Sequence, residues 1–178
     1  RLRKEKDQDV FAQEYMADFR KIQGLVYKEF ERERHIYDDN AVINRRVELV
    51  GIDWGFKNPI AMLRIFTDSD GNFFIDDEYY YSEKTTEEAI EYLGTWKPSY
   101  VYPDPAEPDR NKMLQNAGFY VKDVNKSIKP GIDKVRELFR NNRIFINKKC
   151  VNTITELESY RYDDKLSKEE PVKEHDHA

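Results

Sequence analysis

The sequence contains little cysteine and has no long apolar run. Only one of its 178 residues is a cysteine, Cys150. A lone cysteine cannot form an internal disulfide or a thiolate metal cluster, so any bound metal would need carboxylate or histidine ligands. No apolar stretch approaches the roughly 18 to 20 residues of a membrane helix, and residues 1–9 mix charges instead of forming an apolar signal core. We therefore expect a soluble intracellular protein with no membrane partner.

Glycine is also scarce, with seven residues, and no Gly-x-x-x-x-Gly-Lys-Ser/Thr phosphate loop occurs. ATP hydrolysis is therefore not expected of this chain. Hydrophobic residues make up 39% and aromatic residues 13% of the sequence, enough to bury a core and to exclude disorder for most of the chain. A mass of 21.3 kDa fits one globular domain with a short appendage.

Basic residues are concentrated in one stretch of an acidic chain. The formal net charge is −5, from 30 Lys and Arg against 35 Asp and Glu. Residues 126–149 contain eight basic and two acidic residues, a local balance of +6, so the rest of the chain carries −11. Clustered Lys and Arg attract the phosphates of a polyanion. The alternative is a solvated helix face without a ligand.

Hydrophobic periodicity and turn residues predict a mixed α/β fold. Three antiparallel strands come first, and a Thr-x-x-Glu capping box at Thr85 starts a helix that Gly94 stops. Helices and strands then alternate, with a break at Lys129-Pro130-Gly131. The expected elements are a connector helix over 9–19, strands over 47–54, 59–66 and 73–81, a helix over 85–93, a strand over 100–104, a helix over 108–116, a strand over 119–124, a helix over 132–141, a strand over 144–146 and a helix over 151–160.

Two aspartates end expected strands. Asp53 ends the first strand, and Asp104 ends strand 100–104 between two prolines. If the two strands are parallel neighbours, both carboxylates lie at one edge of the sheet, where open α/β sheets bind ligands. Each could instead form a turn or a cap. Converging carboxylates repel unless a cation lies between them, and Mg²⁺ and Mn²⁺ prefer oxygen ligands, so we predict a metal site.

Two such ions can hydrolyse a phosphodiester, which requires at least one more carboxylate. The candidates lie in the last segment of the chain, where Glu174, Asp176 and His177 cluster. A polar tail without a function is the alternative.

Taken together, these residues resemble the C-terminal nuclease domain of the large terminase subunit of tailed bacteriophages, the motor protein that packages and cuts viral DNA. The resemblance covers nearly the whole chain. Each motif is weak alone, but their order and spacing are fairly specific. They are Gly-Ile-Asp-Trp-Gly at 51–55, Tyr-Pro-Asp-Pro at 102–105, Gly-Ile-Asp-Lys-Val-Arg at 131–136 and the terminal segment 172–178.

The resemblance implies a ribonuclease H-like mixed sheet with an N-terminal connector helix. Residues 1–46 would be the connector and linker from an absent ATPase domain, and residues 47–178 the nuclease domain. Asp53, Asp104 and Asp176 would bind two Mg²⁺ or Mn²⁺ ions, with His177 assisting. The implied partners are double-stranded DNA, the ATPase domain of the same full-length protein, the portal and the small terminase subunit, in the cytoplasm of the infected bacterial host.

The third metal ligand departs from the family pattern, which resembles Asp-His-x-x-Asp with the last Asp as the ligand. Aligning Asp176 and His177 with this pattern puts that last Asp two positions beyond Ala178. The third ligand is therefore either that residue, which we prefer, or Asp176 itself.

We accordingly predict a metal-dependent endonuclease that cuts double-stranded DNA with little sequence preference and uses water as the nucleophile. His177 would position or deprotonate the water, or steady the leaving group. Phosphate contacts, which give affinity without base readout, are assigned more weakly to a basic group. Its members are Lys126, Lys129, Lys134, Arg136 and Arg140.

Other functions remain open from the sequence. Asp53-Trp54-Gly55 also fits phosphate-handling domains of the actin and sugar-kinase class, although a second glycine-rich loop is missing. A non-catalytic DNA-binding or docking module would use the basic segment alone. A transposase or junction resolvase would share the ribonuclease H-like scaffold. The acidic stretch 68–91 has nine carboxylates, but it lacks the spacing of a calcium loop, so we interpret it as a hairpin turn and a capped helix.

Overall fold

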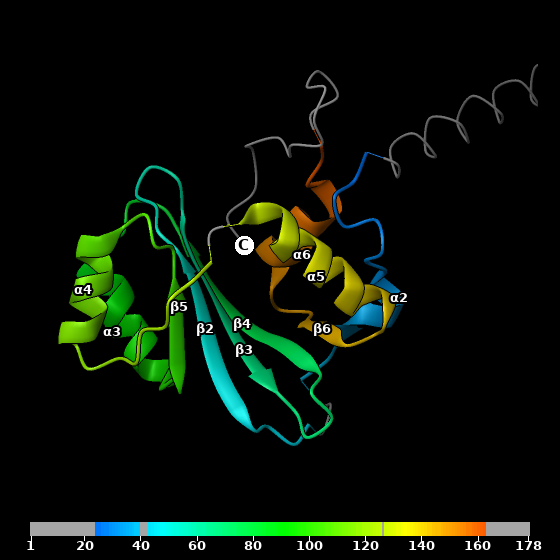
Figure 1. Ribbon diagram of the computed structural model, residues 1–178, viewed down its shortest axis with the longest axis horizontal. Coiled ribbons are helices and arrows are strands. Elements are labelled where there is room, and N and C mark those ends of the chain that lie inside the picture. Colours follow the sequence, from blue (N-terminus) through cyan, green and yellow to red (C-terminus); the bar gives the residue numbers. More distant parts are fainter. Residues whose placement is uncertain (1–23, 40–42, 126, 163–178) are drawn as a thin grey trace, which may run out of the picture.

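A mixed β-sheet lies between two layers of helices (Figure 1). The computed structural model describes residues 24–39, 43–125 and 127–162. The expected connector helix over 9–19, Lys126 and the terminal residues Glu174, Asp176 and His177 lie outside these ranges. None of the described helices is long and apolar enough to cross a membrane.

The sheet has the strand order β1-β6-β4-β3-β2-β5. β2, β3 and β4 form the antiparallel meander that the sequence predicts, and β5 adds to β2 in parallel. β6 and β1 extend the sheet beyond β4, also in parallel. The strands are β1 (Ile36–Tyr37), β2 (Val47–Asp53), β3 (Ile60–Thr67), β4 (Phe73–Tyr81), β5 (Tyr100–Pro103) and β6 (Ile144–Asn147). Three antiparallel strands followed by alternating helices and strands confirm the predicted fold class.

The hairpin between β3 and β4 forms at the expected turn. One carboxylate oxygen of Asp68 accepts hydrogen bonds from the backbone N–H groups of Asp70 and Asn72, both at 2.9 Å. Gly71 adopts a φ of +76°, a conformation that glycine reaches without strain. These contacts account for the acidic turn without a bound ion.

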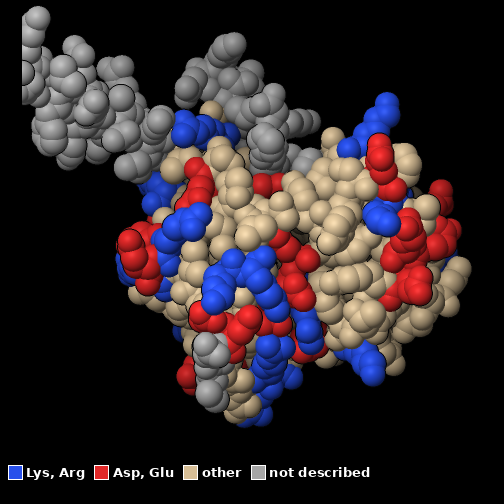
Figure 2. Space-filling model, turned by 180° about the vertical axis from the view of Figure 1, so that it is seen from behind, with Lys and Arg blue, Asp and Glu red and all other residues tan. Residues whose placement is uncertain are grey.

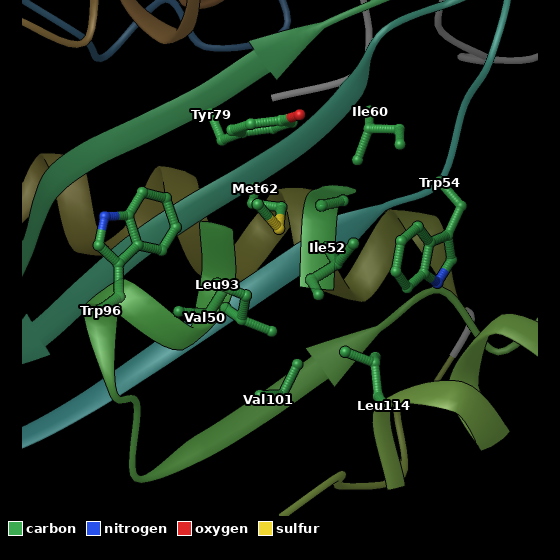
Figure 3. Close-up of a cluster of buried hydrophobic side chains, with 11 residues drawn as sticks. Val50, Ile52, Trp54, Ile60, Met62, Tyr79, Leu93, Trp96, Val101 and Leu114 are labelled. Carbon is green, nitrogen blue, oxygen red and sulfur yellow. The ribbon is translucent and has the colours of Figure 1, made fainter. Parts of the chain in front are cut away.

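One apolar cluster lies between the sheet and helices α3 (Thr86–Trp96) and α4 (Pro108–Asn116) (Figure 3). The sheet contributes alternate residues of its strands to this cluster, because every second side chain of a strand points to the same face. Val50 and Ile52 come from β2, and Ile60 and Met62 from β3. Leu93 of α3 is fully buried against them. We call this group cluster 1.

The opposite face of the sheet carries helices α5 (Ile128–Arg140) and α6 (Val151–Ser159). Phe139, Ile146 and Cys150 form the centre of the second apolar group, which we call cluster 2. Two aromatic rings from residues 24–39, the segment before β2, pack on Phe139. The ring centroids of Phe30 and Tyr27 lie 5.4 Å and 6.2 Å from that of Phe139. Burial raises the pKa of Tyr27 to about 12, with the neighbouring Tyr160 and Tyr162 adding to the shift.

Residues 24–39, assigned from the sequence to a connector and linker, contribute directly to this face. They contain the short helix α2 (Arg32–His35) and β1. His35 is fully buried, and its Nδ1 accepts a hydrogen bond from the backbone N–H of Glu31. Its Nε2 lies 3.0 Å from the carbonyl oxygen of Phe139, which can only accept, so Nε2 carries the proton.

Two helices are longer than the sequence predicts. α3 passes through Gly94 and ends at Trp96, because the buried Trp96 ring adds apolar contact to cluster 1 and Lys97, at a φ of +51°, forms the left-handed end. α5 begins at Ile128 and not at Ile132. Pro130 is tolerated there because the first turn of a helix has backbone N–H groups without helical acceptors.

The predicted strand over 119–124 is wrong. Only one bridge forms, between Val121 and Val101 of β5. The backbone of Val101 donates to the Tyr120 carbonyl and accepts from the Lys122 N–H, after which residues 122–125 run exposed. β5 has only four residues, so it offers the segment a short edge to pair with.

A candidate metal-binding edge of the sheet

Asp53 and Asp104 come to the same edge of the sheet. Asp53 is the last residue of β2, and Asp104 directly follows β5. The two strands pair in parallel with Ile52 opposite Pro103, and the Asp104 N–H donates to the Ile52 carbonyl at 2.8 Å. Both aspartates are half-buried. The expected parallel pairing of the two strands is confirmed.

Both side chains also belong to the same face of the sheet. Ile52 and Val101 lie in cluster 1, under α3 and α4. Strand alternation therefore directs Asp53 and Asp104 to the face that carries α5 and α6. Two carboxylates on neighbouring strands, at one edge and on one face, have the relation that a shared cation requires.

The backbone around Asp104 is fixed by side-chain contacts from α4. Asn111 donates from Nδ2 to the Asp104 carbonyl oxygen at 2.8 Å, and its Oδ1 accepts from Trp54 Nε1 at 2.9 Å. The side-chain amide of Asn111 thus connects Trp54, the residue after Asp53, to the backbone of Asp104. The carboxylate of Asp104 also accepts from the Ala106 N–H at 2.8 Å, which holds its orientation.

The turn that follows Asp53 requires glycine at position 55. A Cβ there would lie 2.4 Å from the carbonyl oxygens of Asn58 and Pro59, too close for any other residue without backbone movement. Arg110 covers this turn by donating to the Gly55 carbonyl at 3.1 Å, and its guanidinium lies 5.7 Å from the Trp54 ring centroid. The edge is therefore rigid on the side of α4.

No group of three or more His, Cys, Asp or Glu that could hold a metal occurs within the ranges that the structure covers. Asp53 and Asp104 are the only members of the predicted metal site in those ranges, because Asp176 and His177 fall outside them. Cys150 is fully buried in cluster 2, and burial raises the pKa of its thiol, so it remains protonated and inert.

The predicted phosphate-binding residues differ in how they are used. Arg136 donates from Nε and Nη2 to the Glu29 carboxylate at 2.8 to 3.1 Å, an ion pair that joins α5 to the segment before β1. Arg140 lies 3.6 Å from the same carboxylate. Lys129 is exposed in the first turn of α5, and Lys134 pairs with Glu137 at 3.0 Å. Arg136 therefore has a structural role, and Lys126 lies outside the described residues.

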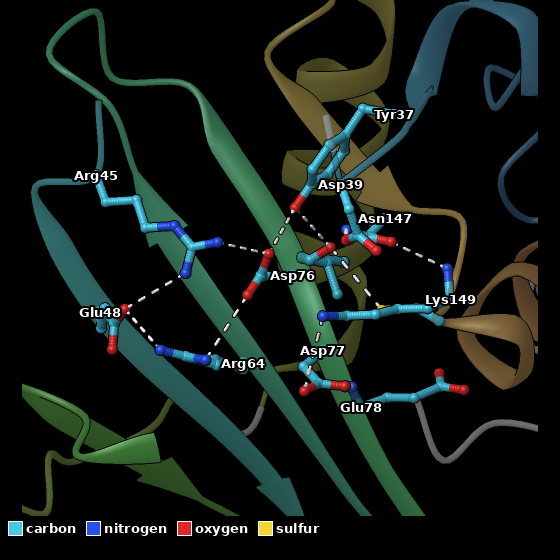
Figure 4. A network of polar contacts seen from close by, with 12 residues as sticks. Tyr37, Asp39, Arg45, Glu48, Arg64, Asp76, Asp77, Glu78, Asn147 and Lys149 are labelled. Atoms are coloured by element: carbon cyan, nitrogen blue, oxygen red, sulfur yellow. Dashed lines mark hydrogen bonds and ion pairs between the residues drawn. The ribbon is translucent and has the colours of Figure 1, made fainter. Parts of the chain in front are cut away.

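Acidic residues of β4 are used within the fold (Figure 4). Asp76, only 4% exposed, accepts from Arg45 at 2.9 Å and from the Tyr37 hydroxyl at 3.2 Å. Arg64 lies 3.8 Å from its second oxygen. A buried carboxylate is stable only with such partners. Figure 2 shows Lys and Arg side chains interleaved with Asp and Glu on the face of the molecule that it presents.

Glu78 caps a helix that is distant in sequence. One carboxylate oxygen accepts from the backbone and side chain of Asn152, and the other from the backbone and side chain of Thr153, at 2.7 to 2.8 Å. These N–H groups belong to the first turn of α6, where a negative charge is favourable. Tyr80 donates to the buried Glu156 of α6 at 2.6 Å.

Sequence reasoning missed Asn111, Glu78 and Glu156. A tryptophan just after a buried strand needs an acceptor for its indole N–H, which is the signal that could have pointed to a polar residue such as Asn111. Nothing local marks Glu78 as the cap of a helix that begins 73 residues later, at Val151.

No family model matches the chain. The large terminase subunit of Escherichia phage T5 is 27% identical over 181 residues, covering 90% of this chain and 41% of that protein. A large terminase from a thermophilic bacteriophage has a TM-score of 0.80 at 25% identity, over 86% of this chain and 42% of that one. This chain thus spans about two fifths of the length of these relatives.

Isolated nuclease domains have the same fold. The P22 large terminase nuclease domain has a TM-score of 0.73 at 19% identity, covering 86% of each chain. The SPP1 large terminase nuclease domain, solved with bound manganese, has a TM-score of 0.59 at 13% identity over 80% of this chain and 90% of that one. The chain is therefore similar in sequence to large terminase subunits, and it has the ribonuclease H-like fold of their nuclease domains.

Proposed function

We propose that this chain is the nuclease domain of a large terminase subunit, a divalent-metal-dependent endonuclease that cuts double-stranded viral DNA during genome packaging. The observation that carries the proposal is the pairing of β2 with β5, which brings Asp53 and Asp104 to one edge and one face of the sheet. The similarity to terminase subunits along 90% of the chain supports the same assignment.

The donor set fits a hard divalent ion. Two half-buried carboxylates offer oxygen ligands, the kind that Mg²⁺ and Mn²⁺ prefer. The manganese in the SPP1 nuclease domain supports this choice of metal. Asp53 and Asp104 would hold the metal, together with Asp176. When bound, a pair of such ions would supply an activated water and charge stabilisation at the phosphorus.

The chain's own residues would prepare this site. Asn111 holds Trp54 and the Asp104 backbone together, so that the two aspartates keep their spacing when the cation is absent. His177 would position or deprotonate the attacking water, since histidine titrates near neutral pH.

DNA would be held through its phosphates on the α5 side of the sheet. α5 covers the face to which Asp53 and Asp104 are directed. Its exposed Lys129 could contact the DNA backbone, and so could Lys134, whose pair with Glu137 is exposed and can be exchanged for a phosphate. Such contacts give affinity without base readout, consistent with little sequence preference. Arg136 is left out of this group because Glu29 holds it. The ATPase domain of the full-length protein, the portal and the small terminase subunit would be partners in packaging.

Substitution of either aspartate tests the proposal. Asp53→Asn and Asp104→Asn should each abolish Mn²⁺-dependent nicking of supercoiled plasmid, because a neutral amide is a poor ligand for a hard cation. Asp123→Asn, which removes an equally charged but exposed carboxylate from the loop before α5, should cut like the parent chain.

Two measurements separate the outcomes. Unfolding curves for the three variants should overlap with the parent, so that a loss of cutting is not a loss of fold. Isothermal titration with Mn²⁺ should lose its heat in the Asp53 and Asp104 variants only. Undiminished cutting by either variant would refute the assignment, and DNA binding that ignores both Mn²⁺ and Asp53 would favour a non-catalytic docking module.

A further inference from the structure

Helix α3 and the turn before it carry carboxylates that the proposed nuclease site does not use. Residues 83–91 contain Glu83, Glu87, Glu88 and Glu91 against one basic residue, Lys84. In Figure 2, acidic side chains gather on the side of the molecule that carries α3 and α4. This surface repels phosphates, so it is not a continuation of the DNA-binding face.

A pocket of about 520 Å³ opens between the end of β4 and α3. Three tyrosines line it, namely Tyr79 and Tyr81 of β4 and Tyr92 of α3, together with Lys84, Glu88 and Glu91. The rings of Tyr81 and Tyr92 both lie 4.7 Å from the Tyr79 ring, at angles of 61° and 48°. Tyr81 is 55% and Tyr92 37% exposed, so ring surface remains open to a ligand.

Tyr79 is the unusual member of this lining. It is only 5% exposed and packs in cluster 1, yet it lines the pocket. Burial raises the pKa of its hydroxyl, and Lys84 and Glu88, which line the same pocket, also act on it. Within the described chain its hydroxyl has no hydrogen-bond partner. Its ring is buried but its oxygen is not among the buried unpaired atoms of the described residues, so the hydroxyl reaches the open side of the pocket and can accept a hydrogen bond from a ligand.

The charges in the pocket favour a cationic ligand. Lys84 donates to Glu88 at 2.8 Å, which neutralises that pair. Glu91 has no hydrogen bond or ion pair to another described residue, and its charge faces the pocket. Aromatic faces beside a carboxylate attract an ammonium or guanidinium group through the ring quadrupole and the charge together.

We propose that this pocket docks a basic segment of a partner protein, which inserts an arginine or lysine side chain against Tyr81 and Tyr92 and toward Glu91. The side chain's N–H groups donate to the Glu91 carboxylate and to the Tyr79 oxygen. The proposal does not depend on nuclease activity, because none of these residues belongs to the Asp53–Asp104 site.

The pocket lies near the proposed metal site but on the other face of the sheet. Tyr81 pairs with Ile60, the residue next to Ala61, and Ala61 pairs with Asp53. The pocket and the aspartates therefore lie at the same edge of the sheet but on opposite faces, since Tyr79 and Ile60 belong to cluster 1. A docked partner would sit beside the proposed metal site and leave the α5 face open to DNA.

Nuclear magnetic resonance of the isotope-labelled 178-residue chain tests this. The probe is a blocked Gly-Ser-Arg-Ser-Gly peptide, titrated to millimolar concentration, and the matched probe carries citrulline, a neutral analogue, in place of arginine. The arginine peptide should shift the resonances of Lys84, Glu91 and Tyr92, and the citrulline peptide should bind at least about fivefold more weakly. Equal binding of the two peptides, or no shift at the pocket, would overturn the proposal.

Variants locate the contact. Tyr81→Ala and Glu91→Gln should each weaken the arginine peptide by about two- to fivefold, the range of an exposed cation–π contact. Glu87→Gln makes the same charge change on the same helix, outside the pocket, and should leave the affinity unchanged. Unchanged affinity in both pocket variants would refute the site. Displacement of the peptide by a short oligothymidine would mean that the pocket serves nucleic acid instead.

Discussion

Cluster 1 and cluster 2 occupy the two faces of one sheet but are assembled differently from the sequence. Cluster 1 and the side chains packed on it come from residues 50–121, one continuous stretch. Cluster 2 joins side chains from residues 27–36, 63–75 and 135–157. A face built from neighbouring elements can be inferred from local patterns, whereas a face built from three distant segments depends on contacts that no local pattern reveals.

Polar contacts strengthen this contrast. On the cluster 2 face, His35 contacts the Phe139 carbonyl, Glu29 pairs with Arg136, and Glu78 caps α6. Each joins residues more than 70 positions apart. On the cluster 1 face, α3 is capped by a contact between Thr85 and Glu88, three residues apart. A substitution on the cluster 2 face should therefore loosen segments that are distant in sequence, whereas a substitution on the cluster 1 face should affect mainly neighbouring residues.

Truncation of one core residue on each face should give the largest effects. Phe139→Ala and Leu93→Ala remove side chains that are 1% and 0% exposed, and each should lower the free energy of unfolding by about 3 to 5 kcal/mol. The variants should differ in where the chain opens. Phe139 holds Tyr27, Phe30 and His35 by ring contacts, so its loss should loosen residues 24–39.

Limited trypsin digestion distinguishes the two variants. Phe139→Ala should be cut faster after Lys28, Arg32 and Arg34 than the parent chain, as identified by mass spectrometry, while Leu93→Ala should keep the parent rate at these positions. Equal rates in the two variants at matched stability would show that the clusters unfold as one unit and that the contrast has no consequence for local opening.

Much of the fold could be predicted from the sequence because β2, β3, β4 and α3 are formed by contacts between residues that are close in sequence. The meander β2, β3 and β4 follows from alternation and a turn that Asp68 stabilises, and α3 follows from its capping box. Residues 24–39 could not be placed, since their burial comes from Phe139 more than 100 positions later. The start of α5 was set too late because Pro130 indicates a break locally but is favourable in a first turn.

The candidate site was predictable to the same extent. Asp53 ends one apolar strand and Asp104 follows another, and both strands lead into glycine- or proline-containing turns, which suffices to expect one shared edge. No sequence pattern indicates Asn111, whose role arises only because α4 packs beside Trp54. Arg136 looked like a phosphate contact in a basic segment, and only the tertiary contact with Glu29 shows its other use.

The Glu29–Arg136 pair should make the cluster 2 face sensitive to acid. Burial tends to raise the pKa of Glu29, but the hydrogen bonds and charge of Arg136 outweigh it, and the pKa is lowered below 4.5. A carboxyl whose pKa is lower in the folded state stabilises the fold above its unfolded-state pKa, and this contribution is lost as pH falls through the folded-state pKa. Unfolding by urea at pH 7 and pH 3 should show the loss.

Glu29→Gln should remove that dependence and lower the stability at pH 7 by about 1 to 2 kcal/mol, the scale of a charge-assisted hydrogen-bonded pair. A double-mutant cycle with Arg136→Met should give a coupling of about 1 kcal/mol at pH 7 that decreases as the pH falls through the folded-state pKa of Glu29. Glu137→Gln, on the same helix but in an exposed pair with Lys134, serves as the control and should change neither value. Coupling that stays constant as the pH is lowered until the protein unfolds would contradict an ionic origin.

The local cap of α3 should give the smallest effect. Thr85 Oγ1 accepts from the Glu88 N–H at 3.2 Å, and the Glu88 carboxylate accepts from the Thr85 N–H at 2.8 Å. Thr85→Ala should cost about 1 kcal/mol, Thr85→Ser should restore most of it, and Thr86→Ala, one position into the helix, should cost less. Hydrogen exchange should quicken in the first turn of α3 and stay unchanged in residues 24–39. Faster exchange in residues 24–39 would show that the two faces are coupled through the sheet, because no described contact of Thr85 reaches the cluster 2 side.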